Sequence, residues 1–410
     1  MLLRQAILHP RRLVTLMVAL STASYFDRTI LSVAAPVLMR DFHFSEPVMG
    51  TVFSAFLLSY TLCMLPSGWL ADKWDSRLIL AVSFLGCGAL TCLLALAGST
   101  VGLAIPALLT FLVARFGFGL FAAPLFPSCA RLITTWYPRD RAASIQGLVT
   151  AGAAVGSALS PALFSRWIAD YGWRTSFMIA GVTTALLSTI WHITAARAPA
   201  PQRAKRKPGS RPSIVALLLH SSFRWLIFSY FCLCYFEYIF YYWIYYYLRE
   251  IKHLGSGETV LAVTILMASM GIMTPLGGWV SDRMVSRFGP ERGPGIVPIV
   301  GLLCSAIFLF FGVRASDVLH TVILLSLAFG FATAAEAPSW AVAFHLSREN
   351  VGTAGGMLNT LGNVGGTLAP VVTPLLAARW GWASGLYGGG VMLVLSVTSW
   401  LVLTVKRYEN

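Results

Sequence analysis

An acidic and a basic residue stand side by side in an apolar run near the start of the chain. The stretch SYFDRTILSVAAP (24–36) contains Asp27 and Arg28. If this run forms a helix that begins near Leu13, a rise of about 1.5 Å per residue places Arg28 about 22 Å along it, inside a hydrocarbon layer of about 30 Å. A charge at that depth costs at least ~2.5 kcal/mol. It therefore faces a bundle interior or a water-filled cavity by default and marks a functional site.

Two kinds of chemistry suit this pair. A guanidinium stays charged and presents a planar fork that fits a carboxylate, and an acid beside it can exchange a proton. The alternative is structural. Adjacent residues on a helix point about 100° apart, so Asp27 and Arg28 could each neutralise a different charge across a helix interface.

Two further acids lie in apolar runs of the second half of the chain. Glu237 lies within YFEYIFYYWIYYY, one turn before Tyr241, and Glu336 lies within AEAP. A buried glutamate needs either a basic partner or a bound proton. These acids could therefore serve proton coupling, or they could form structural pairs with Arg28 or Arg115.

The composition is that of an integral membrane protein. Of the 410 residues, 57% are hydrophobic and 11% are charged, which leaves too few polar residues to cover a soluble globule of this size. The net charge of +14 could indicate nucleic-acid binding, but the basic residues lie in short clusters between apolar runs. They are topology signals, and we expect no nucleic-acid partner.

Apolar runs of the length needed to cross a bilayer, about 20 residues, recur along the whole chain. They lie at about 13–38, 47–71, 78–98, 102–135, 142–168, 174–195, 222–248, 259–281, 294–313, 318–345, 352–378 and 384–405. The sequence therefore predicts an all-α membrane protein with twelve transmembrane helices.

Basic residues concentrate in alternate loops, and this asymmetry predicts the orientation. The stretch RAPAPQRAKRKPGSRP (197–212) is the longest of the basic loops. Its side of the membrane is predicted to be the cytoplasm, together with both termini of a multi-pass protein of the cell inner membrane. Its Pro, Gly and basic content is typical of a flexible linker, here 197–220, between an N-terminal six-helix bundle (1–196) and a C-terminal one (221–410).

An internal repeat supports two related halves. GLVTAGAAVGSALSP (147–161) aligns without gaps on GMLNTLGNVGGTLAP (356–370), and both copies continue to a Gly-Trp pair at the same spacing. GWLADK (68–73) recurs as GWVSDR (278–283). Parallel repeats around a central cavity are typical of transporters.

The stretch GWLADKWDSR resembles a motif of the major facilitator superfamily, G-x-L-x-D-R/K-x-G-x-R, between its second and third helices. Asp75 stands where the motif has its second glycine. The resemblance implies that these residues hold the two halves together on the cytoplasmic side in the outward-open state. The gating residues that it implies, with those of the second copy, are Asp72, Lys73, Arg77, Asp282 and Arg283.

A closer resemblance covers nearly the whole chain. DRTILSVAAPVLMRDF, SAFLLSYTLCMLPSGWLAD and GTAGGMLNTLGNVGGTLAPVVTPLLAARWGW resemble the anion:cation symporter branch, which includes sugar-acid and hexuronate transporters and sialin. The resemblance implies that Arg28 contacts a substrate carboxylate and that Asp27 is a protonation site. In RFGFGLFAAP, Ala122 replaces an acid of the family pattern, and Glu336 stands at the repeat-related position.

The resemblance, together with helical spacing, predicts the sites. The expected substrate contacts are Arg28, Tyr60, Arg115, Tyr241, Trp340, Asn359 and Asn363, and the expected proton-coupling acids are Asp27, Glu237 and Glu336. Ala153, where the family has a glutamine, and the aromatic run at 235–247 suit a less hydroxylated or bulkier anion. Ordinary interhelical packing is the alternative for that run.

The predicted function is secondary active transport of an organic carboxylate by alternating access, coupled to protons. The alternative is an anion exchanger or a uniporter of a bulkier drug- or siderophore-like solute without proton coupling. The scattered histidines and the absence of a nucleotide-binding loop argue against a membrane enzyme. We expect no cofactor and no metal, membrane lipid as surroundings, and a monomer.

Overall fold

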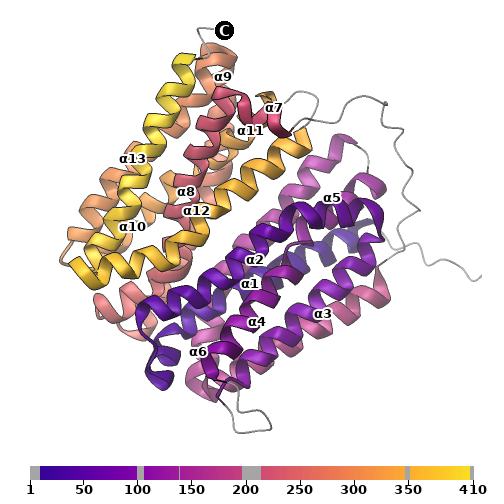
Figure 1. The fold of residues 1–410 in the computed structure, drawn as a ribbon, viewed down its shortest axis with the longest axis vertical. Coiled ribbons are helices and arrows are strands. Elements are labelled where there is room, and N and C mark those ends of the chain that lie inside the picture. The colour runs from indigo at the N-terminus through magenta and orange to yellow at the C-terminus, as the bar shows by residue number, and fades with distance from the viewer. Residues whose placement is uncertain (1–9, 99–105, 138, 196–213, 347–350, 407–410) are drawn as a thin grey trace, which may run out of the picture. The chain divides into compact units, whose positions relative to one another are not determined.

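The computed structural model describes the chain except for residues 1–9, 99–105, 138, 196–213, 347–350 and 407–410 (Figure 1). The part that it describes contains helices and no strand. The chain divides into two compact units, which are described separately. Unit 1 consists of Met1–Val37 and Ala55–Arg206, and unit 2 consists of Leu38–Ser54 and Lys207–Asn410.

Unit 1 is built from six helices, two of which also extend into unit 2. They are α1 (Pro10–Phe42), α2 (Glu46–Lys73), α3 (Ser76–Ala95), α4 (Ala107–Ala122), α5 (Leu125–Trp136) and α6 (Arg139–Thr194). α3 packs against α4, α5 and α6. The carboxylate of Asp75 caps α3 by accepting a hydrogen bond of 2.9 Å from the backbone N–H of Arg77, so the residue that departs from the superfamily motif has a structural role.

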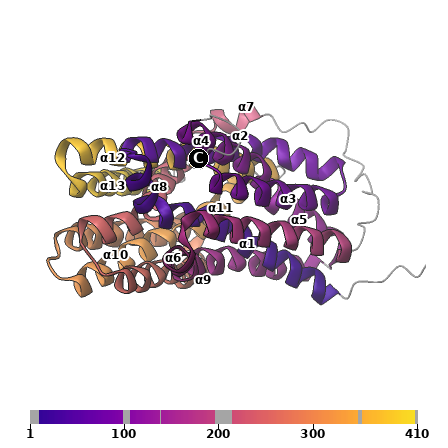
Figure 2. The same cartoon turned by 90° about the horizontal axis from the view of Figure 1, so that it is seen from below.

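Unit 2 contains the remaining elements. They are α7 (Ile214–Leu219), α8 (Ser221–Tyr246), the π-helical turn η1 (Tyr247–Ile251), α9 (Ser256–Arg314), α10 (Val318–Thr333), α11 (Glu336–Leu346), α12 (Val351–Trp380) and α13 (Trp382–Lys406). α8 packs against α12 and α13, and α9 packs against α10 (Figures 1 and 2). α7 lies at the end of the predicted linker 197–220, most of which is outside the described residues. The domain boundaries predicted from the sequence stay predictions.

Ten helical stretches of the described chain are long and apolar enough to cross a membrane. The prediction of an all-α, multi-pass membrane protein is therefore confirmed. α1 is not among the ten, and Ile145–Thr194 counts as one stretch of 50 residues although its backbone turns at Gly172. The number twelve stays a prediction.

The repeat seen in the sequence recurs in the backbone. Gly172 and Gly381, the glycines of the two Gly-Trp pairs, have φ angles of 77° and 83°. Residues with a Cβ rarely adopt such angles, so glycine is needed to turn the chain there. Two segments 209 residues apart thus make the same turn with the same residue pair.

The repeat also places glycine where two helices touch within each unit. A Cβ built on Gly156 of α6 would lie against the carbonyl oxygen of Thr22 in α1. A Cβ built on the equivalent Gly365 of α12 would lie against the carbonyl oxygen of Phe231 in α8. Small residues of this kind let membrane helices approach closely.

We expect Gly156→Ala and Gly365→Ala each to destabilise the protein by about 1–3 kcal/mol, because the added methyl overpacks a backbone contact. Gly147→Ala is the matched control, since Gly147 lies on α6 with open space around its Cα. Thermal unfolding in detergent measures the effect. Unchanged melting temperatures in both variants would contradict the close approach of these helices.

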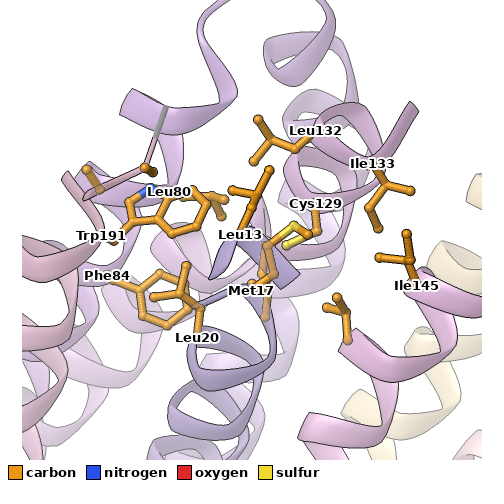
Figure 3. Packing of buried hydrophobic residues seen from close by; sticks show 14 residues of the cluster. Leu13, Met17, Leu20, Leu80, Phe84, Cys129, Leu132, Ile133, Ile145 and Trp191 are labelled. Carbon is orange, nitrogen blue, oxygen red and sulfur yellow. The ribbon is translucent and has the colours of Figure 1, made fainter. Parts of the chain in front are cut away.

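A cluster of buried side chains joins α1, α3, α5 and α6 within unit 1 (Figure 3). Leu13, Met17 and Leu20 of α1 lie between Cys129 of α5 and Trp191 of α6, and all five are at most 2% exposed. Cys129 therefore behaves as a small hydrophobic residue, as expected from its place in an apolar run. The cluster fixes the helix that carries Asp27 and Arg28.

Two predicted spans are interrupted in the structure. α4 and α5 divide the span 102–135, and α10 and α11 divide the span 318–345. Pro124 stands at the first break and Pro338 stands just after the second, and proline has no N–H to continue a helical ladder. Glu336, one of the predicted proton-coupling acids, is the first residue of α11, directly after the second break.

Candidate functional site

Arg28 lies among aromatic rings of unit 1. Its guanidinium carbon is 5.1 Å from the ring centre of Tyr25, 4.9 Å from that of Phe56 and 5.2 Å from that of Tyr60. The residue is 7% exposed. Desolvated cation–π contacts are worth up to about 2 kcal/mol, so the rings stabilise the charge and hold the guanidinium in place. Tyr60, an expected substrate contact, lies beside Arg28.

Arg115 of α4 is buried more deeply, with 1% exposure. It donates a hydrogen bond of 3.4 Å from a terminal nitrogen to the backbone carbonyl of Arg28, and its guanidinium carbon is 4.8 Å from the Phe56 ring centre. Gly119, one turn later, lets α4 approach α2, because a Cβ there would meet the backbone of Phe56. Arg115 therefore positions α1 at Arg28. Its direct contact with substrate stays a prediction.

Asp27 turns toward α6. Its Oδ2 accepts a hydrogen bond of 2.7 Å from Thr184 Oγ1, and its Oδ1 has no hydrogen-bond partner in the described chain. The residue is 2% exposed, and none of the described basic groups lies within 4.0 Å of its carboxylate oxygens. Arg115 of α4 nevertheless interacts with Asp27 electrostatically. The structural alternative, in which Asp27 neutralises a charge across a helix interface, stays a prediction.

One face of α8 carries the acid of unit 2. Tyr230, Glu237 and Tyr241 share this face, at spacings of seven and four residues. Glu237 is 7% exposed, and its Oε1 has no hydrogen-bond partner among the described residues. Tyr230, on the same face of α8 as Glu237, contacts Glu336 of α11, and this contact places the two predicted acids on the same side of α8, where their carboxyl groups interact electrostatically.

Glu336 is held by an aromatic pair. Tyr230 Oη makes a long contact of 3.5 Å with Glu336 Oε1, and Trp340 Nε1 donates to Tyr230 Oη at 3.1 Å. The two rings meet nearly at right angles, with centres 6.2 Å apart. Trp340, predicted to line the substrate cavity, thus orients a hydroxyl group next to an acid.

The predicted amides of α12 form a connected pair. Tyr238 Oη donates to Asn363 Oδ1 at 2.6 Å, and Asn363 Nδ2 donates to Asn359 Oδ1 at 2.7 Å. The Tyr238 ring fits there because α12 has Gly366, whose Cβ would meet the ring. Asn363 is buried and Asn359 is half-buried, so the Asn359 amide is the better placed to meet a substrate.

Tyr241 has partners inside unit 2. Its hydroxyl group lies 2.9 Å from Met270 Sδ, and its ring meets that of Phe329 edge-on at 6.0 Å. Interhelical packing therefore accounts for this part of the aromatic run. A substrate contact of Tyr241 stays a prediction.

The two copies of the superfamily motif share a local structure. Lys73 Nζ lies 4.1 Å from the ring centre of Trp69, and the guanidinium carbon of Arg283 lies 3.6 Å from that of Trp279. In both copies the tryptophan precedes the basic residue by four positions, which places the two side chains on one helix face. The repeat therefore reproduces a side-chain pair as well as a sequence.

The remaining predicted gate residues differ in their surroundings. Arg77 donates from its guanidinium to the carbonyl of His192 on α6, while its own carbonyl accepts a hydrogen bond of 2.9 Å from Trp191 Nε1. Asp282 is exposed on α9. Asp72 belongs to α2, but its side chain lies outside the described residues. The gating role of this group stays a prediction.

Three residues beside the predicted ones were not expected from the sequence. Phe56 lies one turn before Tyr60, and Tyr230 lies two turns before Glu237, so helical spacing could have indicated both. Thr184 gives no such signal, because threonines and serines recur throughout α6.

Comparison with known proteins gives consistent matches. The family model described as Major Facilitator Superfamily matches residues 17–292. A probable sulfoacetate transporter of Cupriavidus necator is 30% identical over 373 residues, which cover 87% of this chain and 85% of that protein. A D-galactonate transporter of Escherichia coli O6:H1 is 28% identical, with 97% of each chain covered. A hexuronate transporter of Bacillus subtilis is 26% identical, with 91% of this chain and 90% of that protein covered.

The fold is also found among solved structures. A bacterial homologue of the human lysosomal transporter Spinster, in an inward-facing and unoccupied conformation, superposes with a TM-score of 0.83. That structure is 17% identical in sequence, and the match covers 97% of this chain and 98% of that one, so it shows the fold alone. The family match and the relatives together decide the family. The chain belongs to the major facilitator superfamily and is a membrane transporter rather than an enzyme.

Proposed function

We propose that this protein transports an organic anion that carries a carboxylate or sulfonate group. The observation that carries the proposal is the position of Arg28, a buried guanidinium in the middle of a membrane helix, ringed by Tyr25, Phe56 and Tyr60. The planar guanidinium group of a buried arginine is suited to bind two oxygen atoms of a carboxylate or sulfonate at once. The names of the relatives, which specify sulfoacetate, hexuronate and D-galactonate, agree with this class.

The transport is proposed to be secondary active and coupled to protons, with alternating access. Asp27, Glu237 and Glu336 are the acids available for coupling, because Ala122 occupies the position of the family's acid in α4. The sequence ranks Asp27 first and Glu336 second. The missing acid at position 122 also favours a second candidate, exchange of anions or uniport of a bulkier solute without proton coupling.

Counterflow tests the transport class. Purified protein in liposomes loaded with D-galactonate, D-glucuronate or sulfoacetate should take up the same labelled anion far faster than protein-free liposomes. A thermal-shift screen of organic acids on the purified protein widens the choice of anions. Counterflow of a neutral or cationic solute, with none for any organic acid tested, would overturn the proposed substrate class.

The protein is proposed to lie in the cell inner membrane as a monomer surrounded by lipid, with both termini in the cytoplasm. A cysteine introduced into 197–212 should react with an impermeant maleimide only after cell lysis. The seven native cysteines are first replaced by alanine or serine, so that only the new thiol reacts. Labelling in intact cells would reverse the orientation that the basic residues predict.

A further inference from the structure

Unit 2 holds two acids that no basic group of the described chain neutralises. Glu237 is more than nine-tenths buried, and its Oε1 has no hydrogen-bond donor in the part of the chain that the structure describes. Glu336 is half-buried at the start of α11, where the helix is interrupted. Arg166 pairs with Asp170 and His320 pairs with Asp317, and neither Glu237 nor Glu336 takes part in these ion pairs.

The helices that pack against α8 supply the groups around the two acids. Glu237 and Glu336 interact electrostatically with each other and with Tyr230, which also interacts with Cys234. α12 presents the neutral amides of Asn359 and Asn363 to α8, and α9 presents Met270 to Tyr241. On α10, His320 is at the first turn and is bound to Asp317. On α13, Tyr387 donates to a backbone carbonyl of α9.

Two ionised carboxylates in such surroundings would repel each other and leave an acceptor without a donor. A charged group that is taken out of water needs a partner of opposite charge or a hydrogen-bond donor. A buried carboxylate without such a partner destabilises the protein by several kcal/mol. One bound proton removes one of the two charges and turns a carboxylate into a hydroxyl donor. Two carboxyl groups that share one proton titrate as a unit.

We propose that Glu237 and Glu336 together bind one proton and form the coupling site of this transporter, in unit 2 rather than in unit 1. The role in coupling rests on the proposed function, whereas the shared proton does not. Tyr230 donates to Glu336, which stabilises Glu336 as the carboxylate, and Glu237, whose Oε1 has no donor among the described residues, carries the proton. Trp340 and Tyr230 are positioning residues.

The two breaks can be compared through the repeat. Ala122 is the last residue of α4, whereas Glu336 is the first residue of α11, so the element bounds pair Glu336 with Leu125, the first residue of α5. The second unit therefore carries an acid at a position where the first unit carries leucine.

Infrared difference spectroscopy of the purified protein tests the shared proton without any substrate. The test uses the Asp27→Asn background, because Asp27 is another buried acid and would add a band of its own. When the pH is lowered from about 9 to about 4, this protein should gain one protonated-carboxyl band in the region of buried acids. Adding Glu237→Gln should move the midpoint of that band to lower pH, because Glu336 then binds a proton without a second carboxylate beside it. Glu258→Gln is the matched control, because Glu258 is an exposed glutamate of the same unit.

A second variant keeps the test valid if Glu237→Gln unfolds. Tyr230→Phe keeps the ring and removes the donor to Glu336, so ionising the pair becomes harder and the midpoint of the band should move to higher pH. In the Asp27→Asn background, an unchanged midpoint after Glu237→Gln, or two bands that titrate independently, would overturn the proposal. So would a band that sodium ions remove at constant pH, because the pair would then be a sodium site. Failure of counterflow with an intact band would reject the proposed transport function and leave the proton site standing.

Discussion

Replacing Arg28 with lysine should lower counterflow of an organic anion by at least about 100-fold while the protein stays folded. The ammonium keeps the charge but loses the planar fork that binds two anionic oxygens at once. It also loses the stacking that orients the guanidinium among Tyr25, Phe56 and Tyr60. A bidentate contact to a charged group is worth several kcal/mol in buried surroundings, and 1.4 kcal/mol is a factor of ten in binding.

Arg40→Lys is the matched control, because Arg40 is an exposed arginine in the last turn of the same helix. It should leave counterflow unchanged. Thermal unfolding of both variants shows whether the fold is kept. Near-normal transport by folded Arg28→Lys would reject the carboxylate-binding role, whatever the fate of the proton site.

The features that the sequence predicted well are local ones. The α-helical membrane fold follows from the lengths of the apolar runs, and the paired glycines Gly156 and Gly365 follow from an ungapped repeat. Hydropathy and spacing are enough to find both. The superfamily follows instead from the resemblance of whole motifs, such as GWLADKWDSR, to those of a known family.

Hydropathy and spacing do not predict which side chains of different helices contact one another. The hydrogen bond between Trp340 and Tyr230 joins residues 110 positions apart, and that between Thr184 and Asp27 joins residues 157 apart. In a membrane, lipid-facing and protein-facing sides of a helix are both apolar, so the sequence does not say which side meets which helix. For the same reason the burial of Arg115 behind the backbone of Arg28 could not be separated from a place in the binding site.

The breaks within α4–α5 and α10–α11 show another limit. A proline in an apolar run can kink a membrane helix or interrupt it, because neighbouring groups satisfy the freed backbone in either case. Nothing in the residues around Pro124 or Pro338 distinguishes a kink from an interruption. The interruption nevertheless places Glu336 at a helix start, where the helix dipole favours a carboxylate.

The second large effect is expected in concentrative uptake. With acid outside, wild-type liposomes should accumulate D-galactonate or another anion that passes the counterflow test. Glu237→Gln and Glu336→Gln should each lose at least about 90% of that accumulation and keep counterflow, because anion binding is then no longer linked to proton binding. Glu258→Gln should keep both activities.

Charge movement distinguishes the acids of the two units. If the pair in unit 2 carries one proton with a monoanion, the step is electroneutral, and a potassium diffusion potential should not change accumulation. If Asp27 carries a second proton, one net positive charge moves, worth ~2.3 kcal/mol per 100 mV, and Asp27→Asn should abolish the voltage dependence. Loss of all accumulation in Asp27→Asn, with Glu237→Gln and Glu336→Gln unaffected, would place coupling in unit 1 instead. If the wild-type protein exchanges the anion rapidly but never accumulates it under the pH gradient, proton symport is rejected and anion exchange is the mechanism.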